Sequence, residues 1–160
     1  FRIDADLDLS KTPGSGAVLA LGSKFGGWSF YLKNGRPVAT MAASQLPADQ
    51  FSVGGREALR AGRVRLTYDF RYDGGVNGGG EMVIRADGRE LARGRIPRTI
   101  SRLAEITDTL DVGFDRATPV VEGVGGEPFT GRISRVDIAL GRATTAGSAG
   151  EPETAKASSP

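Results

Sequence analysis

Apolar and polar residues alternate along much of the chain with the period of two that is typical of β-strands. In residues 63–72 every second side chain is apolar, and the side chains between them are charged or carry a hydroxyl. The apolar members are Val64, Leu66, Tyr68, Phe70 and Tyr72. A helix would scatter these groups around its circumference, whereas a strand points all of them to one side. Residues 63–72 are therefore predicted to form a half-buried antiparallel strand.

The same alternation recurs in four other stretches: residues 1–9, 28–32, 82–86 and 136–140. Trp28 is the only tryptophan, and it shares its parity with Phe30 and Leu32. These three side chains are predicted to lie in the core, as are those of Val136, Ile138 and Leu140. Tyr31 has the opposite parity, which predicts that it lies on an exposed face.

The residues between the predicted strands have the chemistry of hairpin turns. Asn34-Gly35 and Asp87-Gly88 each separate two apolar runs, and both dipeptides accept the positive φ angles of a two-residue turn. A longer glycine-rich connection covers residues 73–80. Roughly ten short strands joined in this way predict an all-β fold, a two-sheet antiparallel β-sandwich of the jelly-roll type.

The chain of 160 residues is expected to form one domain, over residues 1–140. From residue 141 onward the composition shifts to small and polar residues, and residues 141–160 are predicted to be a disordered tail. Before the tail, Ile100, Leu103 and Ile106 are spaced by three, and Ser101 could cap a helix. A short helical turn and an irregular edge strand fit this stretch equally well.

The composition excludes several classes of function. The sequence has no cysteine and no histidine, which removes disulfides, thiolate chemistry and every mechanism that needs an imidazole. The net charge is +2 and basic residues do not cluster along the sequence, so no nucleic-acid partner is predicted. No apolar stretch approaches the roughly 20 residues of a membrane span, so no membrane partner is predicted either.

Two further features of the sequence bear on the source organism and the cellular compartment of the protein. Four of the 21 cationic residues are lysine and the other 17 are arginine, a bias that favours a bacterium with a GC-rich genome. The sequence starts at Phe1, inside a strand pattern and without Met, and is expected to be a fragment of a longer protein. A cytoplasmic and an exported location therefore both stay open.

Three groups of residues are candidates for a chemical role. The glycines of residues 74–80 are followed by Glu81 and a strand, and not by the Lys-Ser/Thr and helix of a phosphate-binding loop. Asp108, Asp111 and Asp115 could supply oxygen ligands to calcium, but aspartates in turns usually bond their own backbone, which is the favoured interpretation. Asp4, Asp6 and Asp8 form a row on the wet face of a predicted strand. No catalytic pair stands out.

Several segments, in order, carry a resemblance to a known family. They are residues 26–35, 70–75, 94–99, 109–113, 118–120 and 129–138. The last has the form F-x-G-x-I-x-x-V-x-I, in which the three-residue step from Ile133 to Val136 predicts a β-bulge. Together, residues 1–140 resemble the C-terminal domain of large bacterial arylsulfatases, a concanavalin A-like and laminin-G-like sandwich.

The resemblance implies a parent enzyme that hydrolyses sulfate esters with a formylglycine nucleophile and a bound calcium ion. The nucleophile arises from a C/S-x-P-x-R motif, which this chain lacks. Formylglycine and calcium are thus expected only in an absent catalytic domain, and no catalytic, cofactor-binding or metal-binding residue is assigned here. Residues 112–117 read Val-Gly-Phe-Asp-Arg-Ala, where the family often shows Val-Gly-Arg-Asp-Thr-Gly.

The implied partner is the upstream catalytic domain of the same chain, which this domain would stabilise. A possible domain interface is predicted on the loop of residues 111–124, with Phe114, Val120 and Val121, and on the corner formed by Ile96 and Arg98. The alternative hypothesis is a laminin-G-like carbohydrate-binding module with a glycan partner. A free-standing glycosidase is a third, less favoured hypothesis, because nothing singles out a pair of carboxylates.

Overall fold

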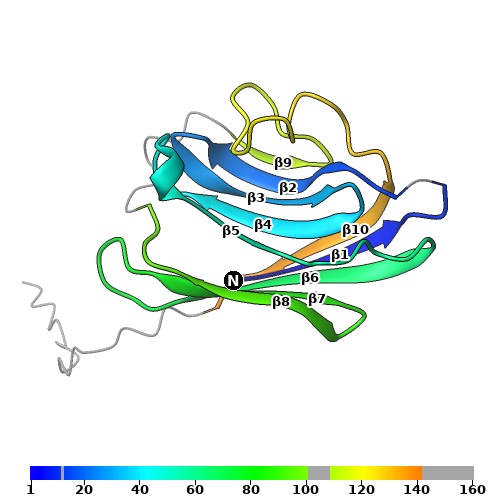
Figure 1. The fold of residues 1–160 in the computed structure, drawn as a ribbon, viewed down its shortest axis with the longest axis horizontal. Helices are drawn as coiled ribbons and strands as arrows, with labels where there is room; N and C mark the ends of the chain where they lie inside the picture. Colours follow the sequence, from blue (N-terminus) through cyan, green and yellow to red (C-terminus); the bar gives the residue numbers. More distant parts are fainter. Residues whose placement is uncertain (12, 101–108, 142–160) are drawn as a thin grey trace, which may run out of the picture.

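The computed structural model describes residues 1–11, 13–100 and 109–141, which form two five-stranded antiparallel sheets packed face to face (Figure 1). The predicted all-β sandwich is confirmed. The first sheet has the order β10-β1-β6-β7-β8. Its strands are β1 (Arg2–Asp8), β6 (Arg63–Tyr72), β7 (Gly80–Ala86), β8 (Arg89–Ile96) and β10 (Arg132–Ala139).

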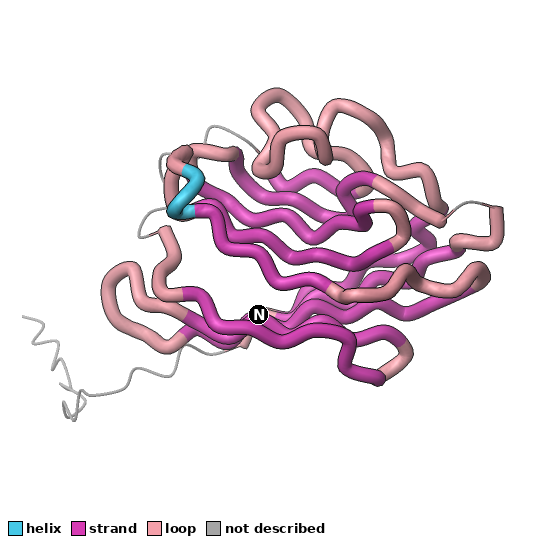
Figure 2. The backbone as a smooth tube through the Cα atoms, in the orientation of Figure 1, coloured by secondary structure: helices cyan, strands magenta, loops and turns pink. Residues whose placement is uncertain are grey.

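The second sheet has the order β5-β4-β3-β2-β9. Its strands are β2 (Gly16–Ser23), β3 (Gly26–Lys33), β4 (Arg36–Ala42), β5 (Gln50–Gly54) and β9 (Leu110–Val112). The single 3-10 turn in the described part, η1 (Pro47–Asp49), precedes β5, and loops make up the remainder (Figure 2). No helix within these ranges is long and apolar enough to cross a bilayer. Residues 101–106, for which a helical turn and an edge strand fit equally well, and the tail beyond Gly141 lie outside the described residues.

The core between the sheets is the one that the alternation predicts. Leu66, Tyr68 and Phe70 of β6 are buried, and β6 is the central strand of the first sheet. Trp28 and Phe30 reach the same core from β3. The ring of Tyr68 lies 5.4 Å from that of Phe30 and 6.5 Å from that of Trp28, centroid to centroid. Aromatic contacts between the sheets therefore anchor the middle of the sandwich.

The predicted turns and the bulge are present. Asn34 and Gly35 have φ angles of 52° and 75°, and Asp87 and Gly88 have 47° and 82°. On β10 the register with β1 shifts, because Leu7 pairs with Ile133 whereas Asp6 pairs with Arg135. The residue between them is the extra residue of the bulge, which lets both Ile133 and Val136 face the same side of β10.

Charged side chains on the outer face of the first sheet form ion pairs between neighbouring strands. The guanidinium of Arg65 donates to Asp6 at 2.8 Å, and Arg93 pairs with Glu81 at 2.8 Å. The hydrogen bond from Arg65 holds the pKa of Asp6 below its usual range. The aspartates on β1 therefore form ion pairs with arginines, in agreement with their assignment to a solvent-exposed face.

The prediction that Tyr31 lies on an exposed face is wrong. Its side chain is 5% exposed, and its hydroxyl lies 3.3 Å from the hydroxyl oxygen of Thr40. The outward-facing Ser29 and Thr40 beside it are buried as well. The prediction is wrong because the outer face of the second sheet is covered around β3, and where both faces of a strand are covered, parity no longer separates buried from exposed residues.

The two buried tyrosines are expected to respond in opposite ways to the loss of their hydroxyl. The Tyr68 hydroxyl is buried and has no hydrogen-bond partner among the described residues, and burial raises its pKa. Tyr68→Phe should raise the free energy of unfolding by about 1 kcal/mol, because an unsatisfied polar group is removed. Tyr31→Phe should lower it by a similar amount, because a hydrogen bond is lost. Urea denaturation measures both, and destabilisation by Tyr68→Phe would contradict the prediction.

Candidate interaction surface

The two sides of the sandwich differ in how closely the sheets approach. On one side β5 lies over β8, and a side chain at Gly94 would come within 2.6 Å of Cγ2 of Val53. Glycine at position 94 therefore allows the sheets to meet here. The sheets are in contact at this point, and residues 52–54 and 90–95 line a depression of about 620 Å³ along the same side.

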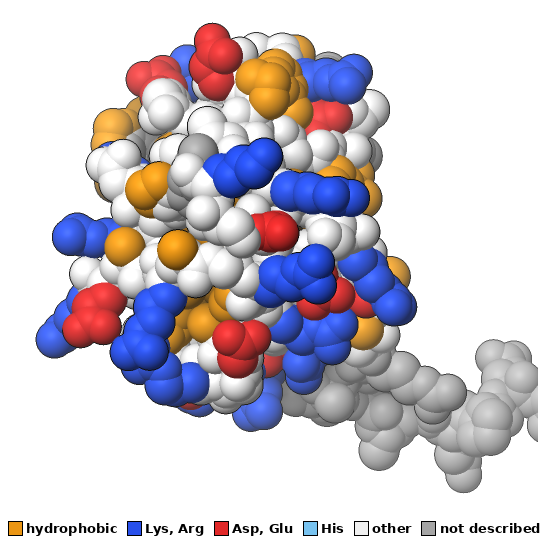
Figure 3. All heavy atoms as spheres, turned by 90° about the vertical axis from the view of Figure 1, so that its right-hand side faces the viewer, with side chains coloured by type: hydrophobic (Ala, Val, Ile, Leu, Met, Phe, Trp, Pro, Cys, Tyr) orange, Lys and Arg blue, Asp and Glu red, His pale blue; other side chains and the backbone are white. Residues whose placement is uncertain are grey.

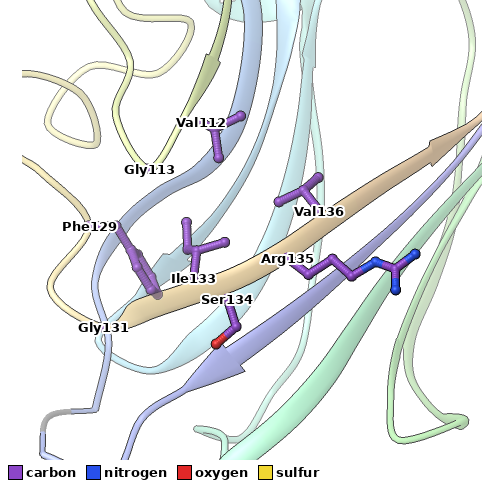
Figure 4. Close-up of a pocket in the computed structure, with 8 residues that line it drawn as sticks. All are labelled: Val112, Gly113, Phe129, Gly131, Ile133, Ser134, Arg135 and Val136. Atoms are coloured by element: carbon purple, nitrogen blue, oxygen red, sulfur yellow. The ribbon is translucent and has the colours of Figure 1, made fainter.

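The opposite side is open. Its borders are the edge strands β9 and β10, and β9 has three residues against eight in β10. A cavity of about 530 Å³ lies between them (Figure 4). It is lined by Val112, Gly113, Phe129, Gly131, Ile133, Ser134, Arg135 and Val136. These residues, together with Leu110, Ile138 and Leu140, are called the open flank below.

The apolar side chains of the flank differ in how far they are covered: Phe129 is buried, and Ile133 and Val136 are partly buried against the core. Ile133, Val136 and Ile138 pair with Leu7, Ala5 and Ile3, whose side chains are in the core. Figure 4 shows Ile133 and Val136 on the side of β10 that faces Val112, with Arg135 directed away. Val112 is nevertheless 55% exposed and Ile138 is 42% exposed.

The prediction that the apolar residues of 136–140 belong to the core is wrong in part, because side chains of β10 and of Leu140 after it are exposed. The predicted direction is right for Val136 and Ile138, but Ile138 is half-exposed and Leu140 is 83% exposed. β10 is the edge strand of its sheet, and β9 is too short to cover it. Sequence alternation gives the side to which a residue points, and an opposing layer is needed to bury it.

A polar rim borders the apolar part of the flank. Arg135 pairs with Asp137 at 2.7 Å, and the hydrogen bond to Asp137 raises the pKa of Arg135. The described residues that line the cavity include one cation and one hydroxyl and no carboxylate. An apolar centre with an arginine-containing rim is the composition of a protein–protein contact. The flank is thus suited to binding by burial of apolar surface.

The residues predicted for a domain interface lie in several environments. Ile96 is 3% exposed and Val120 is fully buried, so neither side chain presents area to a partner. Phe114 and Val121 are half-buried. Arg98 is exposed and forms an ion pair with Asp49. The predicted loop of residues 111–124 reaches the open flank only at Val112 and Gly113.

Asp111 and Asp115, two candidate calcium ligands, bond to backbone groups, as the favoured interpretation expects. Asp111 accepts a hydrogen bond from the N–H of Arg116 at 3.0 Å, and Asp115 accepts one from the N–H of Val120, also at 3.0 Å. Within residues 1–11, 13–100 and 109–141, no group of three or more carboxylates is placed to hold a metal ion. Asp108 lies outside the described residues.

No model of a protein family matches the chain, and no curated protein matches it. The sandwich and its open flank are therefore the observations from which a function can be argued.

Proposed function

We propose that this chain is the non-catalytic C-terminal accessory domain of a bacterial arylsulfatase-type sulfuric ester hydrolase. In this proposal it packs on the catalytic domain that precedes it in the same polypeptide and stabilises that domain. The observation that carries the proposal is the open flank, where Val112 and Ile138 on two edge strands are 55% and 42% exposed.

The flank favours a protein domain as its partner. Leu110 and Val112 on the edge strand β9, and Ile138 and Leu140 at the end of the edge strand β10, are all more than 40% exposed. Contiguous exposed apolar residues of this kind mark interaction sites on soluble domains. Contacts between domains of one chain bury about 600–1,500 Å² and combine apolar and polar groups, as the flank and its rim do.

The choice of a sulfatase as the parent enzyme rests on the sequence resemblance. Two of the segments that carry it, residues 109–113 and 129–138, contain the strands β9 and β10 that border the flank. The resemblance and the uncovered surface therefore coincide in the structure, which supports a role of these segments in contact with the rest of such an enzyme.

In this proposal the catalytic residues lie in the other domain, because this chain lacks the residues that the chemistry needs. The sequence has no cysteine, no histidine and no C/S-x-P-x-R motif from which formylglycine could arise. The described residues hold no donor set for calcium. In this proposal formylglycine and calcium belong to the catalytic domain, and no step of sulfate ester hydrolysis is assigned to this chain.

The proposal is tested on the longer natural polypeptide. Its gene should encode a C/S-x-P-x-R motif upstream of Phe1. Hydrogen exchange at β9 and β10 should be slower in the long polypeptide than in the 160-residue chain, because the flank is covered there. An upstream region without that motif, or unchanged exchange on the flank, would overturn the proposal.

A charged residue on the flank should weaken the assembled enzyme. Val112→Asp places a carboxylate where the flank meets the catalytic domain, and the long polypeptide is expected to lose about 2–4 kcal/mol of stability, since a buried unpaired charge is costly. The isolated chain should tolerate the change, because Val112 is half-exposed. Val76→Asp is the matched control, since Val76 is 88% exposed in the β6–β7 loop and does not line the cavity. Thermal melts of both polypeptides, together with turnover of an aryl sulfate by the long one, provide the measurement.

A further inference from the structure

One end of the sandwich gathers cations that are dispersed in the sequence. Its described loop residues are 8–11, 13–15, 33–36, 54–63, 86–89 and 127–132, and they are called the cationic end. They contain eight lysines and arginines and four carboxylates, whereas the other described residues contain ten cations and eleven carboxylates. Figure 3 looks onto this end and shows Lys and Arg side chains spread over it. The net charge of the described chain, +3, is therefore concentrated here, where it is +4.

The loops of the cationic end are tied together by backbone hydrogen bonds. The N–H of Gly35 donates to the carbonyl of Gly14 at 2.9 Å, and the N–H of Leu59 donates to the carbonyl of Gly35 at 2.8 Å. The N–H of Leu9 donates to the carbonyl of Gly62 at 2.8 Å. These bonds connect loops of both sheets, so the cations are carried on a preorganised frame and little backbone order is lost on binding.

The cations of this end differ from those on the face of the first sheet. Within the described part of the chain, Arg63 is the one cation of this end with an ion pair, to Asp8 at 3.9 Å. Arg56, Arg60, Arg63 and Arg89 line one cavity of about 900 Å³, and Glu57, Asp87 and Glu90 line it with them. Their guanidinium groups therefore keep their hydrogen-bonding capacity for an external oxyanion, which arginine binds in a bidentate manner.

The chemistry of the partner follows from what surrounds these cations. The loops of the cationic end contain one aromatic residue, Phe129, which is 8% exposed, so they offer no stacking platform for unpaired bases or neutral sugars. The four carboxylates among the cations would repel the closely spaced phosphates of duplex DNA, which carries one charge per ~1.7 Å of axis. We propose that the cationic end binds an anionic polysaccharide, whose sulfate or carboxylate groups are more widely spaced.

This inference is independent of the proposed function, because the 160-residue chain itself should bind. Titration calorimetry with dextran sulfate and with polygalacturonate should give saturable binding to at least one of them, and the tighter of the two identifies the preferred anionic group. Binding should weaken as sodium chloride is raised, because screening reduces the attraction. Neutral dextran should not bind. The absence of binding to both anionic polymers, or tighter binding of a DNA duplex, would overturn the proposal.

Two charge-matched double variants separate a localised site from net charge alone. Arg60→Ala with Arg89→Ala removes two arginines of the cavity, and the affinity should fall about tenfold or more, the loss expected for charged hydrogen bonds. Arg71→Ala with Arg116→Ala removes two exposed arginines outside this end and should change the affinity less than about twofold. Circular dichroism verifies that both variants are folded. An equal loss in the two variants would overturn the assignment of the site to the cationic end.

Discussion

Phe70→Ala is expected to lower the free energy of unfolding by about 3–5 kcal/mol, through lost burial and the cavity left behind. The Phe70 side chain is 7% exposed on the central strand of the first sheet, and its ring lies 5.4 Å from that of Phe1. Gly80 on β7 packs directly against the same ring, since a Cβ at position 80 would meet it at 2.5 Å. Denaturation in guanidinium chloride measures the loss.

The neighbouring residue is the control for this prediction. Arg71 points to the other side of β6 and is exposed, so Arg71→Ala should cost less than about 0.5 kcal/mol. The two positions are adjacent in the chain and share the same strand, so a general sensitivity of β6 would affect both. Equal losses would show that the assigned faces of this strand are wrong.

Gly27→Ala is expected to produce the second large effect, a loss of about 2–3 kcal/mol from overpacking. A Cβ at position 27 would meet the carbonyl oxygen of Leu21 and lie 2.8 Å from the amide nitrogen of Ser23. Both are backbone atoms of β2, which pairs with β3 in this region. They cannot move aside without breaking that pairing.

Gly26→Ala is the control for the crowding at position 27. A Cβ there would meet the Cγ2 atom of Ile100 at 3.3 Å, the end of a side chain that can shift. Its cost should stay below about 1 kcal/mol. Thermal melts of the two variants give the comparison, and a similar cost at both positions would mean that backbone crowding is not the cause.

The sequence by itself determines the fold class and the local geometry. Alternation assigns the inner face of β6, and Asn34-Gly35 and Asp87-Gly88 fix two hairpins. The three-residue step between Ile133 and Val136 locates the bulge of β10. All of these depend on residues that are near one another in the chain, whose backbone preferences and side-chain directions are set locally.

Only the tertiary structure decides which strands are edges and which loops meet. Alternation predicts that Val136 and Ile138 lie in the core. Ile138 is nevertheless half-exposed, because β10 is the edge strand of its sheet and β9, the edge strand of the other sheet on this side, has three residues. Tyr31 is buried for the converse reason, since the outer face around it is covered, as the burial of Ser29 and Thr40 shows. The cations of residues 11 to 132 become one surface because five loops end at the same side of the sandwich. A period of two specifies the face of a strand, whereas long-range pairing selects its neighbours, and those neighbours decide what is covered.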